Sequence, residues 1–339
     1  MAIPLTDADR TWYAQEIAPV LPSAVLDFHA HVWSADAWKE RPWETGQPGG
    51  RYMVTDEHYP AERLLHDARA CFPDRDYQAV CFGYPTPAAD WAPDTAYVAD
   101  AARRHQGLYP LLLAGPALEL TRAQYEEALD SGSFHGFKVF LNWYGDDYGD
   151  IGVEQMVGPT ERALANERGL IVMLHVPGRG RLADPHVQAG VRRLAAECPE
   201  AKIVLAHCGR CYLPAQMKAA IGSLRGLANV WMDTSMVMDP VVLQIALNEI
   251  GPGRLLFGTD FPVAAMRGRR VRVRDHWVDV VLPRYPPSAY RVAGEGYRAG
   301  FMAWEIVLAI RWAAELTGIN EAERDGIFHG NGMVLLAND

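Results

Sequence analysis

The stretch LIVMLHVPGRGRLADPHVQAGVRRLAAECPEAKIVLAHCG, residues 170–209, contains the pattern on which the expected fold rests. It begins and ends with short runs that are apolar on both faces, which is typical of buried parallel strands. The segment between the runs has helical patterning. Two parallel strands joined by a helix form one βα repeat, and a histidine, His175 or His207, stands at the end of each strand.

The same unit recurs along the chain, at a spacing of roughly 20 to 35 residues. The apolar runs are AVLDFHAHVW (24–33), AVCFGYP (79–85), LYPLLLAG (108–115), GFKVFL (136–141), LIVMLHVPG (170–178), KIVLAHCG (202–209), NVWMDTSM (229–236) and LLFGTDFP (255–262). Eight such units predict an α/β protein, a (β/α)8 TIM barrel, as one domain over residues 1–339. A doubly wound open sheet is the alternative, but no glycine-rich phosphate loop follows the first run.

The chain exceeds the length of about 250 residues that is usual for this barrel, and the surplus falls in two places. One insertion follows the first strand, from Trp33 to about Pro60, and the other follows the eighth strand, from Val263 to about Gly318. Both leave the carboxyl ends of strands, where barrel enzymes carry their active sites. We therefore expect both insertions to cover or shape a pocket.

Composition and charge narrow the class of partner. The chain has 32 Lys and Arg against 42 Asp and Glu, a formal net charge of −10 that disfavours nucleic acid and anionic membranes as partners. The basic run RGRRVRVRDHW, residues 267–277, is interpreted as a solvated, salt-bridged lid segment. No targeting or membrane-spanning pattern is evident, which predicts a cytoplasmic protein that acts on a small molecule, with self-association left open. The five cysteines, including the CxxC of Cys208 and Cys211, are expected to be reduced thiols.

The first strand carries two histidines one residue apart, in LDFHAHVW, residues 26–33. Side chains alternate along a strand, so His29 and His31 are expected to share one face with Asp27. The opposite face is expected to carry Leu26, Phe28, Ala30 and Val32. Two imidazoles on one face can hold a metal ion, but a buried pair hydrogen-bonded to backbone carbonyls fits an isolated HxH equally well.

Further side chains that bind metals stand at the ends of other strands. His175, His207 and Asp260 each end an apolar run, and Lys138 lies within another run. A barrel brings these strand ends around one mouth. The imidazole and carboxylate donors suit Zn²⁺, with Mn or Fe as alternatives, and leave a coordination position for water. Each residue alone has a structural interpretation, but their shared position favours a metal site.

The motifs along the chain are DFHAH, FKVF, MLH, the Asp184–Pro185 pair, VLAHCG, DTS, GTDFP and a closing GNGMVLL. In their order and spacing, they resemble the amidohydrolase superfamily, specifically its branch of metal-dependent hydrolases and aromatic-acid decarboxylases. The resemblance implies that one divalent metal, preferably zinc, is bound by His29, His31, His175 and Asp260. It also implies that His207 is either a ligand of a second metal or a catalytic residue beside the first.

Lys138 leaves the number of metals open. In binuclear members of the superfamily a lysine of the fourth strand is carbamylated and bridges two metals, whereas in the related branch an unmodified lysine is common. An interior ammonium paired with a carboxylate, or a contact with a substrate carboxylate, are further interpretations. We expect one metal and an unmodified Lys138.

Aromatic and basic residues that follow the strands are candidates for contact with the substrate. They are Trp33, Trp143, Tyr144, Arg179, Arg181 and Arg210. The aromatic rings would form a wall against a planar substrate, and guanidinium groups pair bidentately with carboxylates.

The site predicts hydrolysis of a lactone, ester or amide of a small anionic substrate by a metal-activated water. Asp260 is expected to accept the proton of the water and deliver it to the leaving group, while His207 orients the water or stabilises the oxyanion. Two alternatives remain. One is a nonoxidative decarboxylase of an aromatic or enoic acid on the same site, and the other is a catalytically inactive barrel that binds a ligand.

Overall fold

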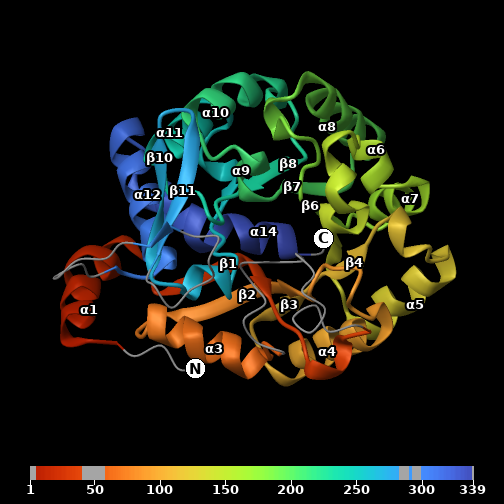
Figure 1. Ribbon diagram of the computed structural model, residues 1–339, viewed down its shortest axis with the longest axis horizontal. Coiled ribbons are helices and arrows are strands. Elements are labelled where there is room, and N and C mark those ends of the chain that lie inside the picture. The colour runs from red at the N-terminus through yellow and green to blue at the C-terminus, as the bar shows by residue number, and fades with distance from the viewer. Residues whose placement is uncertain (1–4, 40–57, 282–289, 292–298, 338–339) are drawn as a thin grey trace.

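A closed ring of parallel strands surrounded by helices forms the core of the structure, a computed structural model that describes residues 5–39, 58–281, 290–291 and 299–337 (Figure 1). The strands of the ring are β1 (Ala24–His31), β2 (Asp76–Phe82), β3 (Leu108–Pro110), β4 (Leu112–Ala114), β5 (Gly136–Val139), β6 (Ile171–Leu174), β7 (Lys202–Leu205), β8 (Val230–Asp233) and β9 (Leu255–Leu256). Strands β1 to β3, and strands β4 to β9, pair in parallel with their neighbours in chain order. The predicted TIM barrel is confirmed.

Two connections complete the ring. β3 and β4 are two parts of the apolar run 108–115, and Leu111 between them donates its N–H to the carbonyl of Cys81 in β2 (2.8 Å). The chain after β9 pairs with β1, where Phe28 donates its N–H to the carbonyl of Phe257 (2.7 Å). With β3 and β4 taken as one strand, each predicted apolar run supplies one strand of the barrel.

Helices cover the outside of the ring (Figure 1). The longer ones are α3 (Ala61–Cys71), α4 (Trp91–Arg104), α5 (Arg122–Gly132), α7 (Pro159–Glu167), α8 (Pro185–Glu197), α10 (Pro214–Ala220), α11 (Pro240–Ile250) and α12 (Met302–Thr317). The shorter ones are α1 (Asp7–Trp12), α6 (Val153–Met156), α9 (His207–Arg210), α13 (Glu321–Asp325) and α14 (Asn331–Leu336). Asp–Pro pairs start α8 and α11, because Asp184 and Asp239 accept first-turn N–H groups and proline has no N–H to leave unpaired.

The hydrophobic core has two layers. The outer layer lies between the strands and the helices, and the inner layer fills the barrel with side chains such as Phe28, Phe82 and Met173. Leu335 of α14 belongs to the inner layer, and its carbonyl accepts a hydrogen bond from Lys202 at the start of β7 (2.8 Å). Helix α14 therefore covers the amino end of the barrel, and the carboxyl ends of the strands form the opposite mouth.

The strict alternation expected along β1 is wrong around His29. The pairing of β1 with β2 shifts register between residues 27 and 30, as in a β-bulge. His29 and His31 both pack against Phe82 of the inner layer, with ring centroids 5.1 and 4.5 Å away. Asp27, expected on the same face, instead accepts a hydrogen bond from Tyr77, whose ring packs against the outer layer (2.8 Å).

The apolar side chains of β1 divide at the same point. Leu26 and Phe28 lie in the inner layer, whereas Ala30 and Val32 lie in the outer layer. The bulge therefore turns two consecutive residues, Phe28 and His29, toward the barrel interior. Both histidines therefore face the interior, as expected, but Asp27 does not.

The two expected insertions are described to different extents. Most of the first, residues 40–57, lies outside the described residues, although Trp33 and Tyr59 on either side of this gap form an antiparallel bridge. The second contains the antiparallel hairpin of β10 (Gly268–Val273) and β11 (His276–Val281), followed by β12 (Tyr290–Arg291). That the chain forms one domain stays a prediction. Within the described parts of the chain, the helices are too short or too polar to cross a membrane.

The basic run 267–277 forms most of this hairpin. It is salt-bridged as expected, with Arg267 paired to Asp9 (2.8 Å) and Arg270 paired bidentately to Asp279 (2.9 and 3.0 Å). The expectation that the run is solvated is wrong for these two arginines, because both of their side chains are only 9% exposed. Buried carboxylates and aromatic rings surround them in place of water.

Candidate metal centre

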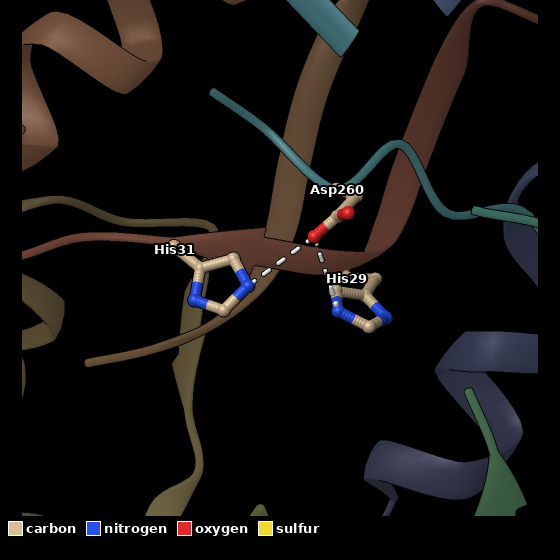
Figure 2. A group of neighbouring side chains, drawn as sticks. All are labelled: His29, His31 and Asp260. Carbon is tan, nitrogen blue, oxygen red and sulfur yellow. Dashed lines mark ion pairs between the residues drawn. The ribbon is translucent and has the colours of Figure 1, made fainter. Parts of the chain in front are cut away.

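Two histidines of β1 and an aspartate that follows β9 meet at the carboxyl end of the barrel (Figure 2). Oδ1 of Asp260 lies 3.3 Å from Nε2 of His31 and 3.5 Å from Nε2 of His29. Both imidazoles are buried, and the side chain of Asp260 is 14% exposed, so the group can be reached from the mouth.

These separations match those between ligands of one divalent metal. Two ligand atoms held at about 2.0–2.1 Å from zinc, at the tetrahedral angle, lie about 3.3 Å apart. The ligand atoms of His29, His31 and Asp260 all lie within 4.8 Å of one another. The group therefore fits a cation with little movement of its side chains.

Hydrogen bonds on the far side of each ring fix the tautomer. Nδ1 of His29 lies 3.0 Å from Oδ2 of Asp233, and Nδ1 of His31 lies 3.1 Å from the carbonyl oxygen of Gly83. Each Nδ1–H is donated to an oxygen, which leaves the Nε2 lone pair of each ring facing Asp260. Lone pairs that face one another in this way repel unless a cation lies between them, and metal-binding histidines have this hydrogen-bonding pattern.

The protonation states also suit metal ligands. Burial lowers the pKa of His31 to about 4 and that of His207 to about 3, so both are neutral at pH 7. Burial opposes ionisation of Asp260, but its pKa is still held below the usual range, at about 2, so the carboxylate is ionised at pH 7. Neutral histidine and ionised aspartate are the forms that bind a cation.

Asp233, the last residue of β8, connects the histidines with one another. Its Oδ2 accepts from His29, and its Oδ1 accepts from the backbone N–H groups of His207 and Ser235 (both 3.0 Å). Burial raises the pKa of Asp233, but the imidazoles of His29 and His207 hold it below its usual range. Asp233 lies in the DTS motif and was not among the expected site residues, although its place at the end of an apolar run was an available signal.

His207 begins a left-handed turn of the backbone. The φ angles of His207, Cys208, Gly209 and Arg210 are 55°, 50°, 65° and 59°. This conformation is unfavourable for residues other than glycine, and such strain concentrates at functional sites. The turn places the ring of His207 4.7 Å from that of His29 and its Nδ1 3.1 Å from the carbonyl oxygen of Ser235.

His29, His207 and Asp233 form a second close group, with ligand atoms within 4.8 Å of one another. This group is explained by hydrogen bonding, because Nδ1 of His29 already donates to Asp233. It therefore supports the rings of the first group, and a role for His207 as a second-metal ligand stays a prediction.

His175, which follows β6, belongs to neither close group among the described residues. Its ring packs against Phe140 and edge-on to His207, with centroids 4.3 and 5.0 Å away. Burial lowers its pKa well below the usual range, and its buried Nδ1 has no hydrogen-bond partner in the described parts of the chain. A nitrogen of this kind is available to a cation, but its expected role as a ligand stays a prediction.

Lys138 is buried inside the barrel beside the group of His29, His31 and Asp260. Its Nζ lies 3.2 Å from Nε2 of His29, 3.3 Å from Sδ of Met173 and 4.3 Å from the centre of the Phe82 ring. Burial lowers its pKa to about 7, against the opposing effect of nearby carboxylates. Lys138 can donate to the same lone pair of His29 that a cation would use. Its unmodified state stays a prediction.

Two of the basic candidates lie beside His207. Arg181 packs over the ring of Tyr212, 5.4 Å from its centre, and this ring lies 6.2 Å from that of His207. Arg210 donates to the carbonyl of Val176 (2.9 Å). Tyr212 itself was not among the residues expected to contact the substrate.

The remaining candidates have other surroundings. Trp33 is fully buried, Trp143 is half-buried against the inner layer, and Arg179 is exposed. The hydroxyl of Tyr144 donates to the carbonyl of Gln155. Their contact with a substrate stays a prediction.

A protein-family model identifies the chain. Residues 26–333 match the family Amidohydro_2, described as amidohydrolase, and the chain belongs to this family. The resemblance to the amidohydrolase superfamily is thereby confirmed. No curated protein matches the sequence.

Solved structures share the fold at low sequence identity. An amidohydrolase from Burkholderia multivorans with bound zinc is 16% identical, with a TM-score of 0.59 over 93% of this chain and 100% of that chain. A putative 2-pyrone-4,6-dicarboxylic acid hydrolase from Pseudomonas putida is 18% identical, with a TM-score of 0.54 over 93% and 98% of the two chains. A 2,6-dihydroxybenzoate decarboxylase in complex with 2,6-dihydroxybenzoate is 14% identical, with a TM-score of 0.52 over 93% and 98%. At these identities the likeness establishes the fold.

Proposed function

We propose that this protein is a metal-dependent hydrolase that cleaves a lactone, ester or amide bond of a small anionic substrate. The observation that carries the proposal is the convergence of lone pairs from His29, His31 and Asp260, at separations that suit one divalent cation. Zinc is the preferred ion because histidine nitrogen and carboxylate oxygen are among its usual donors. Membership of the amidohydrolase family, and the zinc in one relative of the same fold, support this choice.

A cation bound by this group would polarise a carbonyl and lower the pKa of a coordinated water. Asp260 is ionised and partly exposed, so it can accept a proton from the attacking water and return it to the leaving group. His207 donates its Nδ1–H to the carbonyl of Ser235, which leaves a lone pair on Nε2. His207 is therefore suited to orient the water as an acceptor rather than to donate to an oxyanion.

The side of the mouth next to His207 is cationic, which supports an anionic substrate. Arg181 and Arg270 both pack over the ring of Tyr212, at 5.4 and 4.5 Å from its centre. Burial lowers the pKa of Arg181, and the charges of Arg210 and Arg270 lower it further. Arg270 is already paired with Asp279, so Arg181 is the guanidinium group of these two that is suited to pair with a substrate carboxylate.

The reaction is tested with carboxylate-bearing lactones and with aromatic carboxylic acids, given separately to zinc-loaded protein in water labelled with heavy oxygen. The expected result is labelled oxygen in a carboxylate product of a lactone. Release of CO₂ with a carbon-protonated product would contradict hydrolysis and indicate a decarboxylase. Zinc-loaded protein that binds these compounds without turnover would indicate a binding role.

A further inference from the structure

Two buried hydrogen-bond donors near the metal centre lack a partner within the described part of the chain. They are the indole N–H of Trp33 and the hydroxyl of Tyr84. Trp33 is 0% exposed and Tyr84 is 2% exposed. Buried polar groups in folded proteins nearly always have a hydrogen-bond partner, so these two donors are available to a bound molecule.

Tyr84 reaches the site from the end of β2. Gly83, its neighbour in the chain, accepts the hydrogen bond that orients His31 (3.1 Å). The ring of Tyr84 packs edge-on against Trp33, with centroids 5.0 Å apart. Burial raises the pKa of Tyr84 and the charge of Asp260 raises it further, so the phenol stays protonated. The two donors therefore belong to one packed pair, joined to the candidate metal centre through Gly83 and its hydrogen bond with His31.

Hydrolysis of a carbonyl compound needs donors for the oxygen on which negative charge develops. Among the histidines, His31 and His207 donate their N–H groups to backbone carbonyls and have none left for this oxygen. Indole is a donor only, and a protonated phenol can donate one hydrogen bond. The unpartnered pair therefore supplies hydrogen-bond donors that His29, His31 and Asp260 do not have, for the carbonyl that a bound cation would polarise.

We propose that the hydroxyl of Tyr84 and the indole N–H of Trp33 donate hydrogen bonds to the carbonyl oxygen of the substrate and to the charge that develops on it. This inference rests on the proposed hydrolase function. It assigns the Trp33 side of the mouth to the reacting carbonyl and leaves the Tyr212 side for the carboxylate of the substrate.

Tyr84→Phe tests the proposal, because it removes one oxygen and keeps the ring. Tyr125→Phe is the matched control, since the hydroxyl of Tyr125 is also buried but donates to Glu161 (2.9 Å) and accepts from the N–H of Gly115 (3.1 Å). Loss of a partnered hydroxyl destabilises, whereas loss of an unpartnered one does not. In metal-free protein, the unfolding temperature should fall for Tyr125→Phe and stay unchanged or rise for Tyr84→Phe.

Methylphosphonate serves as the probe of binding, because it is a tetrahedral oxyanion of the shape that ester hydrolysis passes through. Calorimetric titration of zinc-loaded protein should show on the order of 10-fold weaker binding to Tyr84→Phe than to wild type, and no change for Tyr125→Phe. Three results would each overturn the proposal: equal binding by wild type and Tyr84→Phe, no binding by wild type, or a loss of stability in Tyr84→Phe like that of the control. Failure of the hydrolase function itself appears separately, as absence of labelled oxygen in the product of wild-type protein.

Discussion

The two sides of the barrel mouth differ in how completely their polar groups are paired. On the side of the candidate metal centre, His29, His31 and His207 each place Nδ1 against an oxygen acceptor. On the aromatic side, around Trp33 and Tyr84, buried donors have no partner among the residues that the structure describes. A paired network fixes ligand geometry before the ligand arrives, whereas an unpaired one is completed by the ligand.

Asp94 of α4 is a further buried polar residue on the aromatic side, where it lies against Gly83 at the end of β2. Both of its carboxylate oxygens are buried and, within residues 5–39, 58–281, 290–291 and 299–337, have no hydrogen-bond partner of normal geometry. A Cβ atom added to Gly83 would lie 1.5 Å from Oδ2 of Asp94, so only glycine fits at position 83. The carbonyl of this same glycine orients His31, so the unpaired side also supports the ligand group.

The largest effect is expected from loss of a metal ligand. His29→Ala or Asp260→Ala should release a tightly bound divalent ion and abolish activity, because few protein ligands hold it. Elemental analysis and turnover measure both effects. His105→Ala, at a histidine paired with Glu62 outside the site, should leave both unchanged. Full metal content and activity in His29→Ala and Asp260→Ala would refute the assignment.

The next largest effect is expected at His207. His207→Asn should retain the metal but lower turnover by about 10²- to 10⁴-fold, the range for a positioned acid or base. Metal content and kcat of the variant separate the two roles. If the variant loses one of two metals, His207 is a ligand and the site is binuclear.

A smaller effect is expected at Asp233. Asp233→Asn should weaken metal binding about 10- to 100-fold, because it disturbs the carboxylate that orients His29. Asp239→Asn is the control, since Asp239 caps α11 and contacts none of the proposed ligands in the described network. Competition with a chelator measures the affinity, and equal affinities in the two variants would show that Asp233 has no orienting role.

The smallest effect is expected at Asp94 and depends on pH. Burial raises its pKa from 3.8 to about 8, so between these values the folded protein binds a proton that the unfolded chain releases. The stability that this proton contributes is present at pH 4 and is lost as the pH rises to about 8. Asp94→Asn does not titrate, so its stability relative to wild type should increase from pH 5 to pH 8. Urea unfolding measures this increase, and Asp100→Asn, at an exposed ion-paired residue of the same helix, should not show it.

The barrel could be predicted from the sequence because parallel strands buried on both faces appear as continuous apolar runs. Which side chains of β1 face the interior could not be predicted in the same way. The bulge depends on how β1 pairs with β2 and not on the residues of β1 alone. Periodicity within LDFHAHVW therefore gave the wrong neighbours for Asp27 while the interior position of both histidines was still found.

Only part of the candidate site could be predicted from the sequence. His29, His31 and Asp260 stand at strand ends, which a barrel gathers in one place. Asp233 and Tyr84 also follow strands, but their importance comes from hydrogen bonds that are made or left unmade in three dimensions. A sequence shows which polar groups are present, but it does not show which of them lack a partner.

The most direct test of the metal centre is anomalous diffraction at the zinc edge from crystals of zinc-loaded protein. The account predicts one zinc ion per chain, bound to Nε2 of His29 and His31 and to a carboxylate oxygen of Asp260, with an unmodified amine on Lys138. Two peaks about 3.5 to 4 Å apart joined through a modified Lys138, or a single peak away from this group, would contradict it.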